Sequence, residues 1–409
     1  MAPKKFWIYL GLCALGILFP VAAISAGWNS NAGIRIDTRH DAFAPQESPS
    51  TANTSAQAAA APAPTERDGS HDFDFEVGTW TIHLKKRLHP LTGSNTWVEF
   101  DGTSKTFKIW DGRAQIEQLE TDSPSAGRIE GLTLRTYDPA AHEWRLSWAN
   151  SKTGILDPAQ VGKFKDGNGE FYTQDKINGK TVLIRFLWSG ITPNSAHFEQ
   201  SFSDDGGKTW EVNWITDQSR VSEEAFNAAT QRFAAVETAS TAADSTERDG
   251  QHDFDPLVGS WKFQLKRLLH PMTGSNTWTD LSGTGVCYKI WDGRAQLDTI
   301  ELDGAAGHIE GLTLRLYDPT ARVWRLYWAN SRIGILDPPQ VGKFTDGHGD
   351  FYAQDTINGK TLLIRYDWTK LTTCAPHFEQ SFSDDGGKTW EANFISNQTR
   401  VPVAANCSH

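Results

Sequence analysis

The sequence contains few cysteines, and their positions limit what they can do. Only 4 occur in 409 residues, and Cys13 lies in a hydrophobic N-terminal stretch. Leu12 precedes Cys13 where lipidation requires a small residue, which excludes a lipoprotein anchor. Cys287, Cys374 and Cys407 all lie in the second half, so they can form at most one intrachain disulfide. No Cys/His spacing typical of a zinc site is present.

Positive charge is also scarce. The chain has 39 Lys and Arg against 50 Asp and Glu, a formal net charge of -11 and a sequence pI of about 5.6. No stripe of basic residues interleaved with aromatics occurs, so we expect no nucleic-acid partner. Catalytic motifs are missing as well: Gly-x-Ser-x-Gly, paired catalytic carboxylates and a phosphate-binding loop. The chain is rich in tryptophan instead, and its 17 Trp residues need a core or a binding surface.

The N-terminus has the pattern of an export signal. Lys4 and Lys5 precede an uncharged apolar stretch over residues 6–24, which Pro20 breaks ahead of small residues. Residues 1–26 are therefore predicted to be a signal peptide or, since about 20 apolar residues span a bilayer, a retained membrane anchor. Either outcome makes the protein extracytoplasmic: periplasmic or secreted, and possibly anchored to the inner membrane. We expect contact with a membrane only through this segment, and only if it stays uncleaved.

Beyond this segment the sequence is duplicated. Residues 27–65 are rich in Ala, Pro, Ser and Thr, which predicts a disordered linker. The stretch ERDGSHDFDFEVGTW then returns as ERDGQHDFDPLVGSW after about 180 residues, a period that fits a whole domain rather than a solenoid unit. We expect domain 1 over 66–220 and domain 2 over 247–401. A linker over 221–246 separates them, with a short helix predicted to start at Ser222.

Each copy has the pattern of antiparallel strands. Turn dipeptides recur about every eight to twelve residues and include Asp-Gly at 101–102 and 166–167 and Asn-Gly at 178–179. Apolar and polar residues alternate over 144–150 and 181–188, which is typical of strands buried on one side. We expect an all-β fold with roughly nine or ten strands per copy and no core helix. Closure into a barrel would remove the exposed edges of so large a sheet.

The start and the end of each copy resemble the lipocalin-like, or calycin, barrels. A Gly-x-Trp motif follows the HDFD lead-in and ends at Trp80 and Trp261, and the last predicted strands end at Arg220 and Arg400. With their HDFD..VG.W start and SxDGGKTWE end, the copies look most similar to an uncharacterised bacterial family of single-domain barrels. The resemblance implies that each Trp lies at the closed end of a barrel with the Arg packed across it, a pairing that cation–π attraction favours.

A third motif is interpreted as structural. Residues 203–210 and 383–390 match the Asp-box pattern SxDxGxTW, which is familiar from sialidase propellers. A propeller repeats the motif once per blade, whereas this chain has it once per copy. We expect a hairpin in which the Asp accepts hydrogen bonds from turn amides while the Trp packs beneath.

Histidines that recur in both copies suggest cofactor sites, but their surroundings disfavour them. His71 lies in the lead-in with Asp72 and Asp74, His89 precedes a proline, and His197 lies on the polar face of its strand. The alternatives are haem held by one histidine, as in nitrobindin-like barrels, and a metal site at His71. We expect solvated or hydrogen-bonded histidines, with no cofactor and no metal.

Four charged residues lie opposite the apolar residues of their predicted strands: Arg135, Arg145, Arg185 and Glu199. We expect them on the outside of the barrel, in cross-strand ion pairs. The alternative is an anion site or an acid/base constellation.

The apolar faces give the predicted ligand site, because aromatic residues share them with a few polar ones. In the segment 210–215, alternation adds Trp214 to this interior and places Asn213 on the opposite face. We expect a small apolar or aromatic molecule to bind there. The alternatives are a packed core without a cavity, an envelope module that is structural or binds proteins, and a hydrolase or isomerase acting in the same cavity. The candidate ligand-binding residues are Trp80, Glu130, Trp144, Trp148, Asn150, Trp188 and Gln200 in the first copy and Trp261, Glu310, Trp324, Trp328, Asn330, Trp368 and Gln380 in the second.

Overall fold

The computed structural model describes most of the chain beyond its N-terminal stretch. The predicted signal or anchor (1–26) and the predicted linker (27–65) lie outside the described residues. Within the described part of the chain, no helix is long and apolar enough to cross a membrane. The described residues are 67–234, 248–305, 307–357, 359–371 and 374–401.

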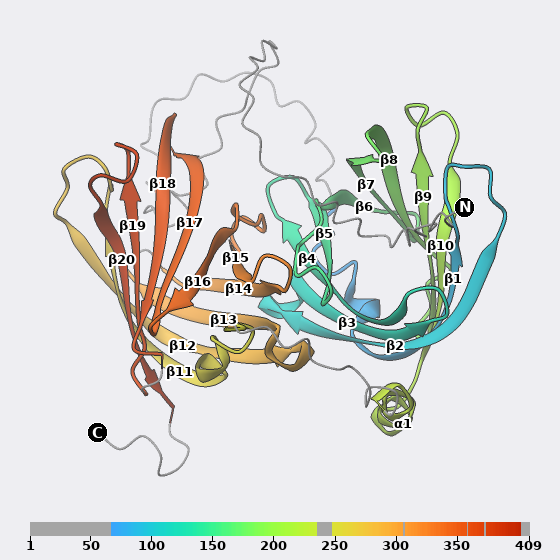
Figure 1. The fold of residues 1–409 in the computed structure, drawn as a ribbon, viewed down its shortest axis with the longest axis horizontal. Coiled ribbons are helices and arrows are strands. Elements are labelled where there is room, and N and C mark those ends of the chain that lie inside the picture. The colour runs from blue at the N-terminus through green and yellow to red at the C-terminus, as the bar shows by residue number, and fades with distance from the viewer. Residues whose placement is uncertain (1–66, 235–247, 306, 358, 372–373, 402–409) are drawn as a thin grey trace, which may run out of the picture. The chain divides into compact units, whose positions relative to one another are not determined.

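The first copy folds into a closed barrel of ten antiparallel strands, barrel 1, drawn in blue to green in Figure 1. Each strand pairs with its neighbours in sequence, and β1 also pairs with β10, which closes the sheet. Alternate residues of every strand therefore face the interior. The strands are β1 (Gly78–Arg87), β2 (Trp97–Ile109), β3 (Ala114–Ser123), β4 (Gly127–Asp138), β5 (Glu143–Asn150), β6 (Gln160–Lys165), β7 (Asn168–Ile177), β8 (Lys180–Ser189), β9 (Ser195–Ser203) and β10 (Glu211–Arg220).

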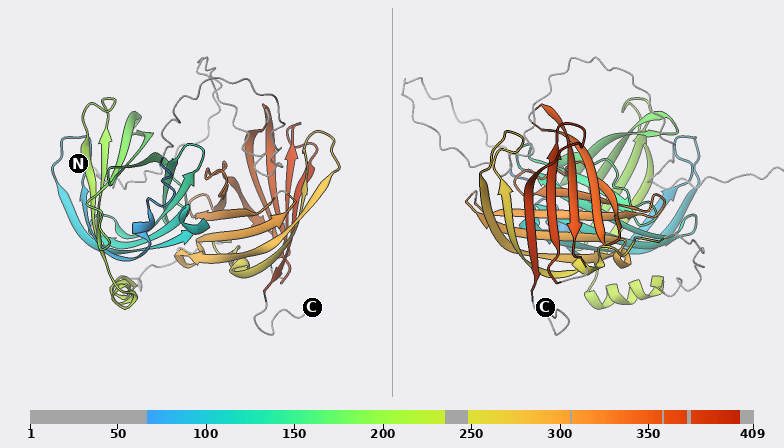
Figure 2. Two further views of the ribbon diagram at one scale, coloured as in Figure 1. Left: turned by 180° about the vertical axis from the view of Figure 1, so that it is seen from behind. Right: turned by 60° about the vertical axis from the view of Figure 1, so that its left-hand side comes forward.

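The second copy repeats this topology as barrel 2, closed by the pairing of β11 with β20. Its orange and red strands lie side by side along the barrel wall in the right-hand view of Figure 2. The prediction of an all-β chain with two tandem antiparallel barrels is confirmed. The strands are β11 (Gly259–Leu268), β12 (Trp278–Ile290), β13 (Ala295–Gly304), β14 (Ile309–Asp318), β15 (Val323–Asn330), β16 (Gln340–Thr345), β17 (His348–Ile357), β18 (Lys360–Thr369), β19 (His377–Ser383) and β20 (Glu391–Arg400).

Two of the predicted turn dipeptides connect strands as expected. Asp166 and Gly167 have φ angles of 51° and 81° between β6 and β7. Asn178 and Gly179 have φ angles of 52° and 80° between β7 and β8. Positive φ at both central residues is what a tight hairpin turn requires, and Asn, Asp and Gly adopt it at low cost.

The Asp-Gly pair at 101–102 does not form the predicted turn, because both residues lie inside β2. A Cβ atom at Gly102 would lie 2.6 Å from the carbonyl oxygen of Glu120 on the paired strand β3. Glycine is therefore needed here for a close approach between strands and not for a chain reversal. Both situations give the same dipeptide, so the sequence alone does not separate them.

Helices are few in the described part of the chain. The helix α1 (Glu223–Ala234) contacts β1, β2 and β3 of barrel 1. The hydroxyl of Ser222 accepts a hydrogen bond from the amide of Ala225 at 3.3 Å, which confirms the helix start expected there. Lys105 Nζ lies 2.9 Å from a carboxylate oxygen of Glu223. The short 3-10 helices are η2 (Asp74–Glu76), η3 (Trp110–Gly112), η4 (Asp255–Leu257) and η5 (Trp291–Gly293).

The HDFD lead-in closes one end of each barrel. Phe73, just before η2, has no exposed surface. Its ring centroid lies 5.1 Å from that of Trp144 and 5.3 Å from that of Trp188, both edge to face. Phe254 makes the equivalent contact with Trp324 in barrel 2, at 5.1 Å. The lead-in therefore inserts an aromatic plug into the barrel, a role that the sequence did not suggest for it.

The predicted pairing of Trp and Arg closes the same end. The Arg220 guanidinium lies 4.1 Å from the ring centroid of Trp80, and Arg400 lies 4.2 Å from Trp261. Arg220 Nη1 also donates a hydrogen bond of 2.6 Å to the carbonyl oxygen of Val77. Each Arg thus fixes the lead-in to the last strand while it covers the Trp, so the pair is structural as expected.

The Asp box forms the expected hairpin turn between β9 and β10. Asp205 Oδ1 accepts hydrogen bonds from the amides of Lys208 and Thr209, each at 3.0 Å. These bonds, and above all the one from the Thr209 hydroxyl, hold the pKa of Asp205 well below its usual range. Trp210 packs against Tyr172, with ring centroids 6.0 Å apart.

Candidate functional site

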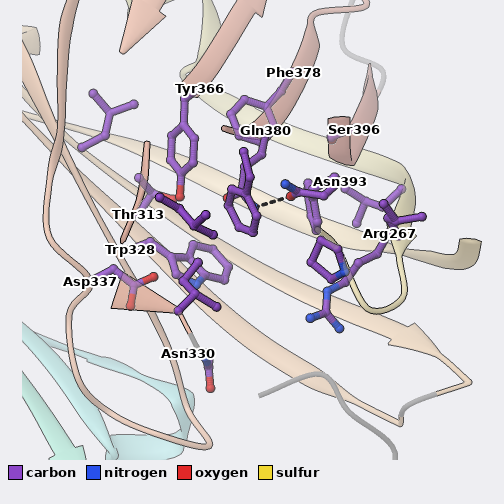
Figure 3. A pocket seen from close by; sticks show the side chains of 18 of the residues that line it. Arg267, Thr313, Trp328, Asn330, Asp337, Tyr366, Phe378, Gln380, Asn393 and Ser396 are labelled. Carbon is purple, nitrogen blue, oxygen red and sulfur yellow. Dashed lines mark hydrogen bonds between the residues drawn. The ribbon is translucent and has the colours of Figure 1, made fainter. Parts of the chain in front are cut away.

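A cavity of about 340 Å³ lies inside barrel 2. Aromatic and aliphatic side chains from β11, β13, β15, β18, β19 and β20 form most of its wall. Figure 3 shows Trp328, Tyr366 and Phe378 around this space, with Gln380 and Asn393 joined by a hydrogen bond. Polar and charged side chains line it as well, among them Arg315, Asp337 and Lys360. A concave space that combines aromatic surface with converging polar groups is the usual form of a small-molecule site.

Four of the seven candidate residues of the second copy line this cavity: Trp328, Asn330, Trp368 and Gln380. The structure brings them together from β15, β18 and β19. The Gln380 side-chain amide donates a hydrogen bond of 2.6 Å to Asn393 Oδ1. Their convergence follows from the alternation that the sequence shows.

The other three candidates of this copy have different surroundings. Trp261 and Trp324 are buried in the core cluster, and their indole N–H groups donate to the carbonyl oxygens of Leu257 and Gly250 at 2.6 and 2.9 Å. They pack the closed end and are not part of the cavity wall described above. Glu310 lies an odd number of positions before the cavity-lining Thr313 on β14, so it faces the outside of the barrel.

The equivalent aromatic residues of barrel 1 divide in the same way. Trp80 and Trp144 have no exposed surface and belong to core clusters. Trp188 is buried, and its indole N–H donates a 2.8 Å hydrogen bond to Glu76 Oε1. Trp148 lies over the backbone of Gly131, where a Cβ atom would come within 2.0 Å of the ring. Gly131 therefore makes room for the Trp148 ring.

The polar candidates of barrel 1 are held by local contacts. Asn150 Oδ1 accepts hydrogen bonds from the amides of Lys152 and Thr153 at 3.1 and 3.2 Å, and so orders the loop after β5. Glu130 accepts a 2.7 Å hydrogen bond from the Ser151 hydroxyl. Gln200 donates a 2.6 Å hydrogen bond to Asn213, which matches the pair in barrel 2.

Simple alternation placed Asn213 on the outer face of its strand. Asn213 faces the interior instead, because β10 contains a bulge. Trp214 pairs with Gln200 and Val212 pairs with Ser201, so Asn213 is an extra residue between them. Asn213 is 1% exposed. In barrel 2 the same irregularity places both residues of the equivalent pair, Asn393 and Phe394, on the cavity wall.

Arg135 is not on the exterior as predicted. It is 1% exposed, and its Nη2 lies 2.6 Å from Glu117 Oε2 in a buried ion pair. Its guanidinium lies 5.0 Å from the ring centroid of Phe73. In barrel 2 the equivalent pair, Arg315 and Asp298, lines the cavity. On β4 the two leucines, Leu132 and Leu134, are buried on one face, and Thr133 and Arg135 are buried on the other. The alternation of apolar and polar residues therefore did not show which face was the interior.

The other three charged residues lie outside the barrel as expected. Arg145 Nη2 is 3.2 Å from Asp138 Oδ2. The Arg185 guanidinium lies 4.9 Å from the ring centroid of Trp210. Glu199 lies 3.3 Å from His197 Nε2. Only Arg145 makes the expected ion pair between neighbouring strands, β5 and β4; Glu199 and His197 both lie on β9, and the printed contact of Arg185 is with a ring. These contacts support the wall rather than a site.

Glu76 is a buried carboxyl that sequence reasoning missed. It has no exposed surface, and it accepts hydrogen bonds from Trp188 Nε1 at 2.8 Å and Gln218 Nε2 at 3.4 Å. Burial raises the pKa of Glu76, and Glu117 adds to the rise while Arg135 opposes it. A comparison of the two copies could have singled out Glu76, because the second copy has Leu257 at the equivalent position.

Asp157 is a second carboxyl that the sequence did not single out. It follows β5 in a loop, and its amide donates a 2.7 Å hydrogen bond to the carbonyl oxygen of Trp148. Burial, and to a lesser extent Asp175, raises the pKa of Asp157 to about 7. The equivalent residue of the second copy, Asp337, lines the cavity of barrel 2.

The recurring histidines make surface contacts. His71 Nδ1 lies 3.4 Å from Asp74. His197 Nδ1 lies 2.6 Å from Asp217, and although partial burial lowers the pKa of His197, its hydrogen bonds to Asp217 and Glu199 raise it overall.

One further group has the composition of a metal site. Within the described ranges, His348, Asp350 and Asp367 on β17 and β18 bring one possible ligand atom each within 4.8 Å of one another. His348 Nε2 lies 3.0 Å from Asp367 Oδ2. The His348 side chain is exposed, and no histidine or carboxyl of the recurring lead-in motif takes part.

The cysteines fit the expected limit of one disulfide. Cys374 is disulfide-bonded, whereas Cys287 is a free, buried thiol. Burial raises the pKa of the Cys287 thiol, and nearby Asp298 adds to the rise. A buried thiol of this kind is poorly nucleophilic, so it contributes packing and not reactivity.

No protein-family model matches the sequence, and no curated protein matches it either. Among solved structures, the S-type phycobiliprotein lyase CPES from Guillardia theta is 12% identical with a TM-score of 0.28, over 39% of this chain and 95% of that one. A protein with unknown function from the DUF3598 family, from Nostoc punctiforme PCC 73102, is 10% identical with a TM-score of 0.24, over 82% and 100%. Both are lipocalin-like barrel proteins. At TM-scores below 0.5 this likeness supports no inference about function, and it does not identify the bacterial family expected from the motifs.

Proposed function

We propose that the protein binds a small apolar or aromatic molecule inside barrel 2. The observation that carries this proposal is the cavity of about 340 Å³ within the closed sheet. Protein interiors are normally close-packed, so a core that served stability alone would not keep such a space. The volume lies in the range of small-molecule pockets, about 300–1,000 Å³.

The polar groups of the wall support a defined orientation for the ligand. Gln380 and Asn393 are joined by a hydrogen bond, which holds both amides in place. Tyr366 of β18 pairs directly with Gln380 of β19, and Trp328 of β15 also lines the space, so aromatic rings lie beside these amides. Figure 3 shows these groups around one space, so a ligand that enters it contacts aromatic faces and amides together.

A ligand screen tests this proposal. The purified full chain is mixed with long-chain esters, fatty acids and polycyclic aromatics, and tryptophan fluorescence and Tm are recorded. A true ligand changes the fluorescence, because Trp328 and Trp368 line the cavity. It also raises Tm, since it stabilises the folded state by RT ln(1 + [L]/Kd), about 2.7 kcal/mol at a hundred times Kd.

A cavity-filling variant provides the control. Thr313→Phe puts an aromatic ring into the space and should abolish both responses, whereas Tyr352→Phe, on an exposed side chain, should keep them. If no compound moves either signal in the unmodified chain, or if Thr313→Phe responds like the unmodified chain, the proposal is wrong.

We further propose that the chain is exported, on the pattern of residues 1–26 alone. N-terminal sequencing of the protein from fractionated cells tests this. Mature protein should begin near residue 26 or 27, or retain Met1 in the membrane fraction. Soluble cytoplasmic protein that still carries Met1 would contradict export.

A further inference from the structure

A tyrosine hydroxyl stands on the cavity wall of barrel 2 where barrel 1 has a plain phenyl ring. Tyr366 on β18 corresponds to Phe186 on β8. The two rings are held in the same way, because each packs edge to face on an aromatic residue of the next strand. The ring centroids are 5.1 Å apart both for Phe186 with Phe198 and for Tyr366 with Phe378. The second copy therefore keeps the ring and adds a polar group that faces the cavity.

The Tyr366 hydroxyl has no hydrogen-bond partner among the described residues. Tyr366 is half-buried, and its Oη is accessible from the cavity rather than enclosed by protein. Thr313 Oγ1 and Trp328 Nε1 on the same wall are likewise accessible and form no hydrogen bond in the described part of the chain. A ligand that fills the cavity removes water from these groups, so it must offer them a partner or bind more weakly.

Four polar side chains gather on this part of the wall. Figure 3 shows the hydroxyl of Tyr366 directed toward the side of the space where Thr313, Trp328 and Asp337 lie. Thr313 on β14 pairs directly with Trp328 on β15. The amide of Asp337 donates a 2.8 Å hydrogen bond to the carbonyl oxygen of Trp328, which holds this loop residue against the wall.

The Asp337 carboxylate lies near enough to the Tyr366 hydroxyl to affect it. Burial raises the pKa of Tyr366, and the charge of Asp337 adds to the rise. The hydroxyl of Tyr366 therefore keeps its proton at neutral pH and can donate it in a hydrogen bond. One part of the cavity thus combines an O–H donor with a carboxylate acceptor.

The charges of the wall disfavour a charged ligand group at this place. An anion would be repelled by Asp337. A cation would meet Arg267, Arg315 and Lys360, which outnumber the two carboxylates of the wall, Asp298 and Asp337. Either ion would also lose its hydration in an enclosed space, which is costly without a dedicated partner. The ligand group that meets Tyr366 is therefore neutral.

A hydroxyl is the neutral group that complements both side chains. It donates one hydrogen bond and accepts two. It can donate to Asp337 in a charge-assisted bond, because a carboxylate accepts several hydrogen bonds, while its oxygen accepts from Tyr366. A carbonyl or an ether has no proton for Asp337, and an alkyl group leaves the Tyr366 hydroxyl without a partner.

We infer that barrel 2 selects apolar or aromatic molecules that carry a hydroxyl group, an alcohol or a phenol, which donates to the Asp337 carboxylate and accepts from the Tyr366 hydroxyl. Tyr366 sets this selectivity, since barrel 1 has the ring without the hydroxyl. The inference rests on the proposed function, because it names the chemical class bound in the same cavity.

A matched series of three ligands tests the inference on the full chain. Naphthol carries the hydroxyl, methylnaphthalene has a methyl group of similar size at the same ring position, and methoxynaphthalene keeps the oxygen without a proton to donate. In a purely apolar cavity the methyl compound binds more tightly than naphthol, because a hydroxyl buried without a partner costs free energy. The inference predicts the reverse. Isothermal titration at neutral pH should show naphthol binding at least about tenfold more tightly than either of the others, which corresponds to about 1.4 kcal/mol.

Variants at the two side chains locate the contact. Tyr366→Phe gives barrel 2 the residue that barrel 1 has, so the barrel should still fold. Naphthol should then bind about tenfold more weakly, with methylnaphthalene not weakened. Asp337→Asn should weaken naphthol by at least about threefold, because a bond to a neutral amide is weaker than one to a carboxylate. Tyr352→Phe, which removes an exposed tyrosine hydroxyl from β17, is the control and should leave all three affinities unchanged.

The outcomes distinguish this inference from the proposed function. If methylnaphthalene binds as tightly as naphthol, or if Tyr366→Phe keeps the preference for naphthol, the inference is wrong and ligand binding by barrel 2 stands. Should Tyr366→Phe not fold, an unchanged preference in Asp337→Asn contradicts the inference in its place. The inference also fails if none of the three binds although other compounds of the wider screen do. If no compound of either set binds, the proposed function itself is wrong.

Discussion

Burial controls the ionisation of individual carboxyl groups in barrel 1. Glu76 has no exposed surface, and burial raises its pKa. Asp157 lies in the loop after β5, where burial and then Asp175 raise its pKa to about 7. An ordinary aspartate is fully ionised at neutral pH, whereas Asp157 still titrates there. The stability of barrel 1 should therefore depend on pH in the neutral range.

Asp157→Asn should expose this dependence. The pKa of Asp157 is about 7 in the folded state and 3.8 for the free side chain, so the folded state holds the proton to higher pH. The resulting stabilisation is complete below pH 3.8 and is lost as the pH rises through 7. Between pH 4 and pH 8 this titration should lower the unfolding free energy of the unmodified chain by up to about 4 kcal/mol, less any solvent screening. The variant has no carboxyl at this position, so its unfolding free energy should rise by the same amount relative to the unmodified chain.

Urea unfolding at several pH values measures this gain. Asp175→Asn is the matched control, because it removes the second cause of the raised pKa and should reduce the pH dependence without abolishing it. A difference between Asp157→Asn and the unmodified chain that stays constant from pH 4 to pH 8 would contradict the assignment.

Gly311 allows Trp328 to lie on the cavity wall. A Cβ atom at Gly311 would come within 2.2 Å of Cη2 of the Trp328 ring. Gly311→Ala should therefore lower the unfolding free energy by about 1–3 kcal/mol, because the ring must move. Trp328→Phe should relieve this clash, so a double-mutant cycle should give a coupling of about 1 kcal/mol or more. Additive effects would show that the two residues do not compete for space.

At the scale of elements, the lead-in and the bulge shape each interior. The lead-in puts Phe73 among Trp144, Trp188 and the buried Arg135, and so closes one end of barrel 1. The bulge in β10 turns Asn213 into the barrel beside Gln200. Neither the lead-in nor the bulge is part of the regular strand pairing, yet together they determine which side chains meet inside the barrel.

Removal of the plug should be costly. Phe73→Ala deletes a ring with no exposed surface and should lower the unfolding free energy by about 3–5 kcal/mol. Phe107→Ala, at a ring that is 42% exposed on β2 of the same barrel, should change it by about 0.5 kcal/mol or less. Chemical denaturation of both variants measures the contrast. Similar losses for the two would show that the lead-in does not seal the barrel.

The predictable elements were those with one buried face. Alternation over 144–150 and 181–188 correctly gave strands with Trp144, Trp148 and Trp188 on one side, because charged residues, Arg145 and Arg185, mark the opposite side of each. It failed on β4, where Arg135 and its neighbours are buried on both faces, and at Asn213, because a bulge has no signature in the period of two.

The candidate site was predictable only in part for a similar reason. Trp328, Asn330, Trp368 and Gln380 were expected inside and do line the cavity. That the space between them stays open depends on how side chains from several strands meet, and no single strand carries that information. That Leu257 replaces a carboxyl residue can be recognised only by comparison with Glu76 of the first copy.

At the scale of the whole molecule, the chain contains two sheets that each close on themselves. No strand of one sheet pairs with the other in the described part of the chain. Each sheet has its own lead-in, its own pair of Trp and Arg and its own Asp box. Duplication thus gives two interiors with one topology, free to differ in the side chains that face inward.

Residues 66–220 and 247–401, expressed separately, should each unfold in one cooperative transition, because each holds a complete barrel. A longer first half, ending at residue 234, should be somewhat more stable, since α1 contacts β1, β2 and β3. Circular dichroism during thermal unfolding measures both. If neither half folds alone, the strands depend on the other copy and the predicted boundaries are wrong.

The central claim is that barrel 2 holds a small apolar molecule. Native mass spectrometry of the full chain, purified gently from the cells that make it, tests this most directly. The account predicts a non-covalent adduct of small mass that is released on denaturation and is absent from Thr313→Phe. Protein that shows only its own mass in every preparation, or an adduct that Thr313→Phe retains, would contradict it.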